Sequence, residues 1–251
     1  MKLTMEAFEK IEGLFPRQRG NVKFFTFSVL TAMLHVMENG CRWRGLPQES
    51  GNWHTIHTRA GRWSKNGVPD RILSVLRTES IVRIDHILLD STIIKVHPDG
   101  TGALKRNGPQ SIGKTCGGHT TKINTIAIDD KKSLDFSLSC GQSPDAPEGR
   151  KLLDKLNGKN LEGVPVIMDR AYEDNKTGEL VSNPGMKPVV PPKRNRIVKW
   201  EYDREMYKKR NEVERLFRRL KRFRRIFTGF DKLDVMFNFF VTFGLILDMI
   251  N

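Results

Sequence analysis

The stretch ILLDSTIIKVH, residues 87–97, decides how the rest of this chain is interpreted. Its β-branched and apolar residues are typical of a buried strand, and two similar runs follow, TTKINTIAI at 120–128 and SLDFSLSC at 133–140. We therefore predict three consecutive strands. Asp90 lies in the apolar half of the first strand, where burial of an unpaired carboxylate costs free energy. This residue either caps the following turn or serves chemistry.

The chain beyond the third strand alternates between helix and strand patterns. The predicted elements are a helix over 145–156 (DAPEGRKLLDKL), a buried strand over 164–172 (VPVIMDRAY), a short strand over 187–193 (KPVVPPK), a basic helix over about 203–225 and an apolar helix over 235–250. The first helix is expected to begin at a capping pair of Asp145 and Glu148. Asp169 ends the buried strand, and capping of a turn is again the alternative explanation. This order of elements predicts an α/β fold of the RNase H-like type, a mixed sheet flanked by helices.

Residues 1–83 have a different pattern and predict a small, all-helical N-terminal domain, whereas 84–251 form the RNase H-like domain. Gly40 is expected to stop one of the N-terminal helices. Trp43, Trp53 and Trp63 are expected to build the core of this domain rather than to stack on bases. The segment 52–76 places basic residues beside apolar anchors, which is typical of a helix-turn-helix and also of ordinary amphipathic helices. The glycine-rich loop over 98–118 is expected to be flexible.

Composition restricts the class of protein. The net charge of +14 favours a polyanionic partner, although an RNA-binding or merely basic protein remains an alternative. Three widely spaced cysteines without a CxxC motif predict neither a zinc site nor a disulfide framework, and they fit a reducing cytoplasm. The first residues lack the apolar region of a signal peptide, and the apolar run over 235–250 is too short to cross a bilayer.

The predicted basic helix carries three different stripes. At 100° per residue, one narrow arc collects Tyr207, Arg210, Glu214 and Lys221, beside an apolar arc and a basic arc. Intrahelical pairing of Arg210 with Glu214 is an adequate structural explanation for two of the four residues. Residues 193–225 contain 15 Lys or Arg and 5 Asp or Glu, which is +10 of the chain's total of +14. An acidic residue inside a basic patch suggests that the protein cuts nucleic acid as well as binding it.

The spacing of Tyr207, Arg210, Glu214 and Lys221 resembles the YREK signature of DDE-type transposases of the insertion-sequence four and five superfamily. Further similar segments follow in the family's order: GCRWRGLP at 40–47, RWSKNGV at 62–68, ILLDST at 87–92, GGHTTKIN at 117–124, GQSPD at 141–145, MDRAYED at 168–174 and VPPKRNR at 190–196. Cys116, His119 and Ala171 depart from the family pattern. None of these departures lies in the acidic triad.

The resemblance implies a transposase that binds insertion-sequence ends, cleaves DNA strands and transfers the 3′-OH ends to target DNA. It implies Asp90, Asp169 and Glu214 as catalytic residues and ligands of Mg²⁺, with Mn²⁺ as a substitute, acting by two-metal chemistry. The DNA-binding residues that it and the basic patch imply are Tyr207, Arg210, Lys221, Lys193, Arg194, Arg218 and Arg222. The partners expected are double-stranded DNA at the transposon ends and target, and at least a second copy of the chain. The location implied is the bacterial cytoplasm, at the nucleoid when the protein is bound to DNA.

Two other functions remain open at this point. One is an RNase H-like nuclease that does not transfer strands, and the other is an inactive DNA-binding protein derived from a transposase. Tyr207 as a covalent nucleophile is a weaker alternative because its alignment with Glu214 favours a phosphate or base contact. A metal site at His54 and His57, which are spaced i, i+3, is also a weaker alternative.

Overall fold

The structure is a computed structural model, and it describes residues 3–17, 24–80, 83–197 and 199–251. The helices are α1 (Met5–Glu12), α2 (Thr26–Asn39), α3 (Trp53–Lys65), α4 (Val68–Ser80), α5 (Asp145–Asp154), α6 (Asn175–Ser182), α7 (Arg204–Tyr207), α8 (Asn211–Lys221), α9 (Arg224–Phe227) and α10 (Asp234–Ile250). The strands are β1 (Ile87–Val96), β2 (Gly113–Thr115), β3 (Gly118–Ala127), β4 (Ser133–Cys140), β5 (Pro165–Met168), β6 (Lys187–Val189) and β7 (Thr228–Gly229).

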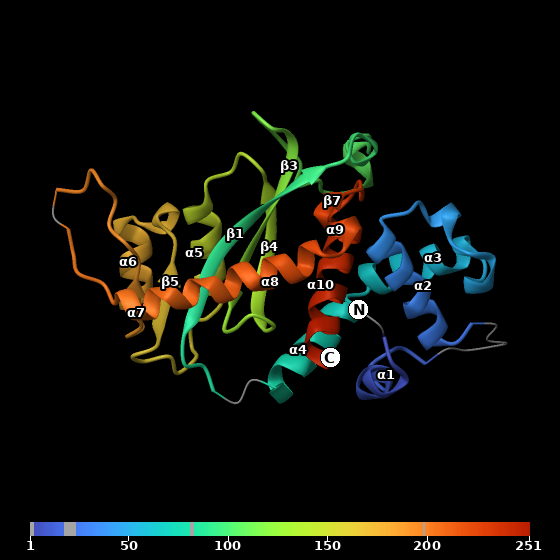
Figure 1. Cartoon of the computed structure of the whole chain (residues 1–251), viewed down its shortest axis with the longest axis horizontal. Coiled ribbons are helices and arrows are strands. Elements are labelled where there is room, and N and C mark those ends of the chain that lie inside the picture. The colour runs from blue at the N-terminus through green and yellow to red at the C-terminus, as the bar shows by residue number, and fades with distance from the viewer. Residues whose placement is uncertain (1–2, 18–23, 81–82, 198) are drawn as a thin grey trace.

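The described strands form one mixed sheet (Figure 1). Its main strands lie in the order β4, β3, β1, β5, β6, so the first strand of the chain is central. β3 runs antiparallel to both β1 and β4, whereas β5 is parallel to β1 and β6 is parallel to β5. Short β2 and β7 pair with β3 and β1. The predicted RNase H-like arrangement of a mixed sheet flanked by helices is confirmed.

The two faces of the sheet are covered by different helices, and alternate side chains of β1 pack against one set or the other. Ile87 and Leu89 pack in a cluster with residues of α5 and α6, while Leu88 and Ile94 pack in a cluster with residues of α8 and α10. Successive side chains of a strand point to opposite faces. Asp90 shares the parity of Leu88 and Ile94, so it faces the side of the sheet that α8 crosses (Figure 1).

Several predicted elements differ from the observed ones. The strand predicted over 187–193 is shorter, because β6 ends at Val189. The strand predicted over 164–172 is shorter, because β5 ends at Met168 and a 3-10 turn, η5 (Arg170–Tyr172), follows. The glycine-rich loop over 98–118 includes β2, which pairs with the start of β3 across a turn where Gly118 has φ +98°. The expected capping pair of α5 is wrong, because Pro144 is the N-cap and makes no side-chain hydrogen bond. Asp145 instead accepts hydrogen bonds from Ser91 and Lys122.

The basic helix predicted over about 203–225 is not one regular helix. A 3-10 turn, η6 (Lys208–Arg210), separates α7 from α8, and the helix ends again where Phe223 turns extended and buries its ring. Rotation per residue is therefore 120° rather than 100° across η6. Because side chains at i and i+3 eclipse in a 3-10 turn, Tyr207 still lies in line with Arg210. Tyr207, Arg210 and Glu214 therefore stay in one line although the helix is not regular.

The described residues of the N-terminal part form helices and no strand, as predicted, and α2 ends at Gly40, which has φ +62°. α3 and α4 are separated only by Asn66 and Gly67, and the helix-turn-helix stays a prediction. Trp63 is buried and Trp43 is partly buried against the core, whereas Trp53 is half-exposed beneath the guanidinium of Arg44.

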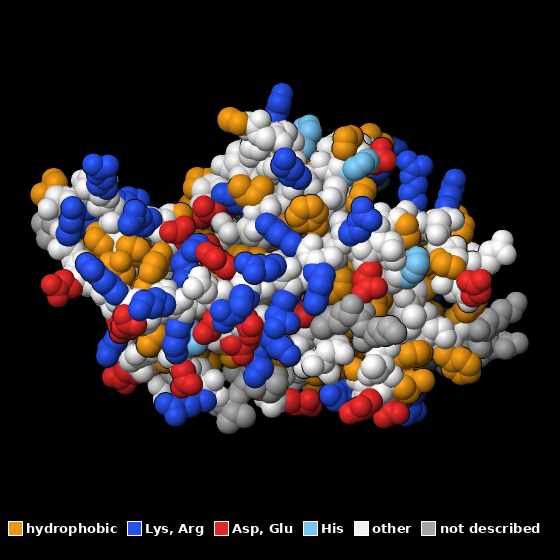
Figure 2. Space-filling model, in the orientation of Figure 1, with side chains coloured by type: hydrophobic (Ala, Val, Ile, Leu, Met, Phe, Trp, Pro, Cys, Tyr) orange, Lys and Arg blue, Asp and Glu red, His pale blue; other side chains and the backbone are white. Residues whose placement is uncertain are grey.

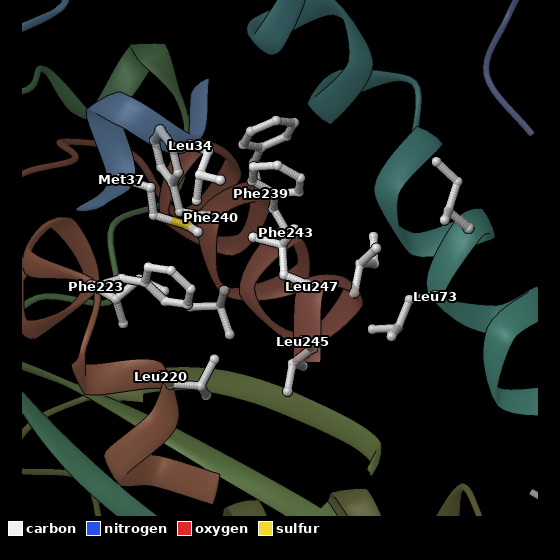
Figure 3. Packing of buried hydrophobic residues seen from close by; sticks show 14 of the residues in the cluster. Leu34, Met37, Leu73, Leu220, Phe223, Phe239, Phe240, Phe243, Leu245 and Leu247 are labelled. Carbon is white, nitrogen blue, oxygen red and sulfur yellow. The ribbon is translucent and has the colours of Figure 1, made fainter. Parts of the chain in front are cut away.

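The apolar helix α10 joins the N-terminal helices to the sheet. Figure 3 shows Phe239, Phe240 and Phe243 of α10 packed among side chains of α2, α4 and the end of α8. One continuous cluster of buried side chains therefore spans both sides of the boundary between 1–83 and 84–251. That boundary stays a prediction. Within the described residues, no helix has the length and apolarity that a bilayer crossing needs.

Candidate active site

The register of two parallel strands brings the two candidate aspartates together. Leu89 of β1 lies opposite Met168 of β5, so Asp90 and Asp169 follow at the same level on adjacent strands. Neighbouring strands are about 4.8 Å apart. Asp169 comes directly after the last residue of β5 and its side chain accepts a hydrogen bond from the backbone N–H of Arg170. The two residues are 79 positions apart in the sequence and adjacent in the fold.

The helix α8 brings the third carboxylate to the same place. The Arg210 guanidinium at its start contacts all three acids: Nη2 is 2.7 Å from Asp90 Oδ2 and 3.6 Å from Asp169 Oδ2, and Nη1 is 2.6 Å from Glu214 Oε1. Sequence spacing predicted only the pair of Arg210 with Glu214. The structure shows Arg210 at the centre of a four-residue cluster of Asp90, Asp169, Arg210 and Glu214, which we call the carboxylate cluster.

Three polar contacts and an apolar side fix α8 over this edge of the sheet. His86, immediately before β1, lies with Nε2 2.9 Å from Oε2 of Glu212, two residues before Glu214. Further along the helix, Arg215 and Arg219 both contact Asp130, which follows β3. Buried Val213, Leu216 and Leu220 supply the apolar side of the helix. These contacts orient the stripe that carries Arg210 and Glu214 toward Asp90.

The carboxylate cluster runs from buried to exposed. The Asp90 side chain is 8% exposed, while those of Asp169 and Glu214 are 43% and 47% exposed. Burial raises the pKa of Asp90 to about 6, although the Arg210 guanidinium and the Ser91 backbone N–H favour its charged form. Burial alone would lower the pKa of Arg210, but the charges of Asp90 and Asp169 outweigh burial and raise this pKa above its ordinary value. The guanidinium therefore stays charged. The cluster is therefore open to solvent at one end only.

A second polar group lies on the opposite face of the sheet, behind the aspartates. Ser91 Oγ donates to Asp145 Oδ1 at 2.8 Å, and the nearly buried Lys122 Nζ donates to the same oxygen at 2.8 Å. The hydroxyl of Tyr172 is buried there close to Ser91, and burial raises the pKa of Tyr172. Sequence reasoning did not assign Lys122 or Ser91 to the site, although GGHTTKIN and ILLDST contain them.

The other two residues of the predicted stripe, Tyr207 and Lys221, have weaker or no contact with the carboxylate cluster in the part of the chain that the structure describes. Burial raises the pKa of Tyr207, and Arg210 and Asp169 are near enough to influence it. Tyr207 packs edge-on against Tyr202 with ring centroids 5.6 Å apart. Lys221 lies at the far end of α8, where burial lowers its pKa, and no contact with the carboxylate cluster is seen among the described residues.

The basic candidates form a surface around the carboxylate cluster. Figure 2 shows Lys and Arg side chains gathered along the band where α7 and α8 cross the molecule in Figure 1. Arg194 and Arg218 are exposed. Lys193 is held by the backbone oxygen of Glu173 at 2.8 Å, and Arg222 lies 3.7 Å from the buried Asp248. Arg218 therefore lies on the same helix as Glu214 and Arg222 caps the end of that helix, while Lys193 and Arg194 lie on the segment after β6.

The residues fit a divalent cation in their chemistry, although their present arrangement holds Arg210. Mg²⁺ takes carboxylate oxygens, and three carboxylates here converge on one cationic group. In the described ranges, no three His, Cys, Asp or Glu side chains are grouped so that they could hold a metal ion as they stand. His57 packs against Trp43 and His97 against Phe230, so neither belongs to the cluster.

Fold and site together define an RNase H-like α/β protein whose clustered carboxylates lie within a basic surface. Two family models match it in succession: "Putative transposase of IS4/5 family (DUF4096)" over residues 3–73 and "Transposase DDE domain" over residues 83–245. The second match covers more than half of the chain, which therefore belongs to the family of DDE-domain transposases.

Individual proteins are also similar. The chain is 32% identical over 113 residues to "Uncharacterized protein y4sN" of Sinorhizobium fredii (strain NBRC 101917 / NGR234), which covers 42% of this chain and 86% of that protein. Among solved structures, the piggyBac transposase synaptic complex with hairpin DNA aligns at 8% identity over 76% of this chain with a TM-score of 0.39. The pre-cleavage Mos1 transpososome aligns at 10% identity over 72% with a TM-score of 0.30. The chain spans 48% of the piggyBac chain and 65% of the Mos1 chain.

Proposed function

We propose that this transposase binds the ends of its own insertion sequence, cleaves the DNA strands there with Mg²⁺, and joins the freed 3′-OH ends to target DNA. The observation that supports this most directly is the convergence of Asp90, Asp169 and Glu214 from three separate elements onto one point inside the basic surface. Like charges are costly to gather, so a protein that gathers them in this way uses the site for a cation. DNA is the polyanion that the surrounding Lys and Arg residues fit.

The chain's own residues divide the work. Asp90, Asp169 and Glu214 would hold Mg²⁺, which would supply activation of water and charge stabilisation at the leaving 3′-oxygen. Tyr207, Arg210 and Lys221 bind phosphates near the cut, while Lys193, Arg194, Arg218 and Arg222 hold the flanking backbone. The N-terminal helices α3 and α4 recognise the ends. We place the active protein in the bacterial cytoplasm, on the nucleoid, as a dimer or larger assembly that pairs two ends.

A cleavage assay tests the proposal. The substrate is labelled DNA that carries the sequences flanking the reading frame, incubated with the purified chain and Mg²⁺. We expect Asp90→Asn, Asp169→Asn and Glu214→Gln each to lower cleavage at least about a hundredfold while end binding persists, because each removes one anionic ligand. Asp154→Asn, an exposed acid at the end of α5, is the matched control and should cut normally.

The same assay separates the other functions. Joining of the cut ends to a target plasmid indicates a transposase, whereas cutting without joining indicates a simple nuclease. Full activity in any one of the three acid variants would overturn the proposed ligand set. A wild-type chain that binds the ends but never cuts them would leave only the DNA-binding function.

A further inference from the structure

The carboxylate cluster already contains a cation, and that cation is the protein's own Arg210. We propose that Arg210 is the resident counter-ion of Asp90, Asp169 and Glu214 before a divalent metal binds, and that it exchanges with the metal. This inference rests on the proposed function. It concerns how the site is loaded rather than which residues form it.

The hydrogen bonds show why the two cations compete. Nη2 of Arg210 donates a hydrogen bond to Oδ2 of Asp90 at 2.7 Å, and Nη1 donates one to Oε1 of Glu214 at 2.6 Å. A metal ion needs lone pairs on carboxylate oxygens at little more than 2 Å, so it competes with the guanidinium for Oδ2 of Asp90 and Oε1 of Glu214. A metal ion beside an unmoved guanidinium would also bring two positive groups within a few ångströms of each other, which is repulsive. Entry of the metal therefore requires Arg210 to leave.

Arg210 has a reason to leave, because the cluster does not satisfy it completely. Its Nε is buried and lacks a hydrogen-bond acceptor within the described ranges. An unsatisfied buried donor costs free energy that a new acceptor would return. The residue also ends the 3-10 turn η6 at the start of α8, where the side chain is 24% exposed and borders the basic band. It can therefore move outward without unfolding the core.

The released guanidinium fits a DNA phosphate. Arginine presents a planar fork of donors that matches phosphate oxygens in two-point contacts. Metal and DNA would then act on the same side chain: the metal displaces it from the carboxylates, and the phosphate captures it. Two ligands that favour the same position of one residue raise each other's affinity. Arg210 would thus reserve tight metal binding for the DNA-bound protein.

The test measures binding of Mn²⁺ alone to the full-length chain by electron paramagnetic resonance, without DNA. Arg210→Gln removes the competing charge and should bind Mn²⁺ on the order of tenfold more tightly than the wild type. Lys209→Gln is the matched control, because it removes the same charge from the adjacent residue, for which the described contacts include none with the cluster. It should change the affinity by less than about twofold.

Arg210→Lys supplies a second variant that keeps the charge. A single ammonium cannot bridge three carboxylates as the fork does, so this variant should bind Mn²⁺ with intermediate affinity. Double-stranded DNA should raise the Mn²⁺ affinity of the wild type and have little effect on Arg210→Gln. Melting temperatures with and without Mn²⁺ confirm that each protein is folded. They should also show a larger metal-induced rise for Arg210→Gln.

The outcomes distinguish this inference from the proposed function. If Arg210→Gln binds Mn²⁺ no more tightly than the wild type, while Asp90→Asn abolishes binding in both backgrounds, the metal site stands and the exchange is wrong. If Mn²⁺ binding does not depend on Asp90 in any variant, both the metal site and the exchange are overturned. If Lys209→Gln raised the Mn²⁺ affinity as much as Arg210→Gln does, the cause would be the lower net charge of the protein. That result would also overturn the exchange.

Discussion

At the scale of single residues, Asp90 is the most constrained member of the site. It is nearly buried and two further carboxylates face it, so its environment disfavours the charged state although Asp90 pairs with Arg210. A protein that keeps such a residue gives up stability for chemistry. Its neighbours Asp169 and Glu214 are more exposed and pay a smaller desolvation cost.

This environment predicts a pH dependence of stability in metal-free buffer. The pKa of Asp90 is about 6 in the folded chain against an ordinary 3.8, so the folded state holds the proton more tightly. The resulting stabilisation is fully present below pH 3.8 and is lost as the pH rises through about 6. Asp90→Asn removes this titration, so the variant should be more stable than the wild type near pH 7, by up to about 3 kcal/mol. Urea denaturation with EDTA between pH 4 and pH 7 measures it, and equal pH profiles for the two proteins would contradict it.

Gly149 of α5 is a second constrained residue. A Cβ there would lie 2.5 Å from Cε1 of Tyr172 and 3.0 Å from Cδ2 of Leu89, both of which are buried. Gly149→Ala should therefore displace the η5 turn that follows Asp169, lower the unfolding free energy by about 1–3 kcal/mol and reduce cleavage.

The matched control for Gly149 is Gly178→Ala in α6, where a Cβ meets nothing within 4 Å. Alanine there should be neutral or stabilising by up to about 1 kcal/mol, because it favours the helix. Thermal unfolding of both variants checks the pair. Equal stability of Gly149→Ala and Gly178→Ala would show that the Tyr172 ring can shift without a cost in free energy.

At the scale of elements, α8 combines three functions on one short helix. Its apolar side packs on the sheet, its start carries Arg210 and Glu214 to Asp90, and its outer side presents arginines to solvent. Because one rigid element carries the acid and the basic surface, DNA held by the arginines is positioned relative to Glu214.

The outer arginines predict the salt dependence of DNA binding. Arg218→Ala and Arg222→Ala should each weaken binding to end DNA and to unrelated DNA alike, and lower the slope of log K against log salt by about 1, because each removes one phosphate contact. Lys151→Ala on α5 is the control; this exposed residue pairs with Glu148 and should leave the slope unchanged. Fluorescence anisotropy over a salt series measures all three. Loss of end binding alone would instead assign base recognition to these arginines.

At the scale of the whole molecule, α10 makes the N-terminal helices and the sheet parts of one structure. Phe240 is fully buried, with its ring 5.9 Å from that of Trp43 and 4.8 Å below the guanidinium carbon of Arg225. Arg225 also donates to the backbone oxygen of Cys41 and pairs with Asp231. The contacts between the two halves are therefore both apolar and polar.

This shared core predicts a single cooperative unfolding transition. Trp43, Trp53 and Trp63 report on the N-terminal helices, whereas Trp200 lies beyond β6. In Trp200→Phe, the midpoint from tryptophan fluorescence should therefore equal the midpoint from circular dichroism, which reports on the whole chain. Phe240→Ala should lower both midpoints together, at a cost of about 3–5 kcal/mol. Two separate midpoints would indicate that the halves unfold independently.

The sequence by itself determined the order of elements, because strand and helix patterns depend on local periodicity. The strands at β1, β3 and β4, the helix at α5 and the helical N-terminal part followed from these patterns, as did the in-line placement of Arg210 and Glu214. Local patterns were less reliable where a polar side chain could form hydrogen bonds either within its own helix or with distant strands. Asp145 was expected to cap its own helix, and it bonds instead to Lys122 and Ser91 of the neighbouring strands.

Only the tertiary structure decided where the three acids meet. The register of β1 with β5 sets Asp90 beside Asp169, and the choice of sheet face beneath α8 adds Glu214; neither depends on residues that are near in sequence. The same long-range packing placed Arg210 among the acids. Sequence spacing predicted only Glu214 as its partner, and the fold adds Asp90 and Asp169. Strand register and helix packing are set by the sum of many distant contacts, and no window along the chain contains that sum.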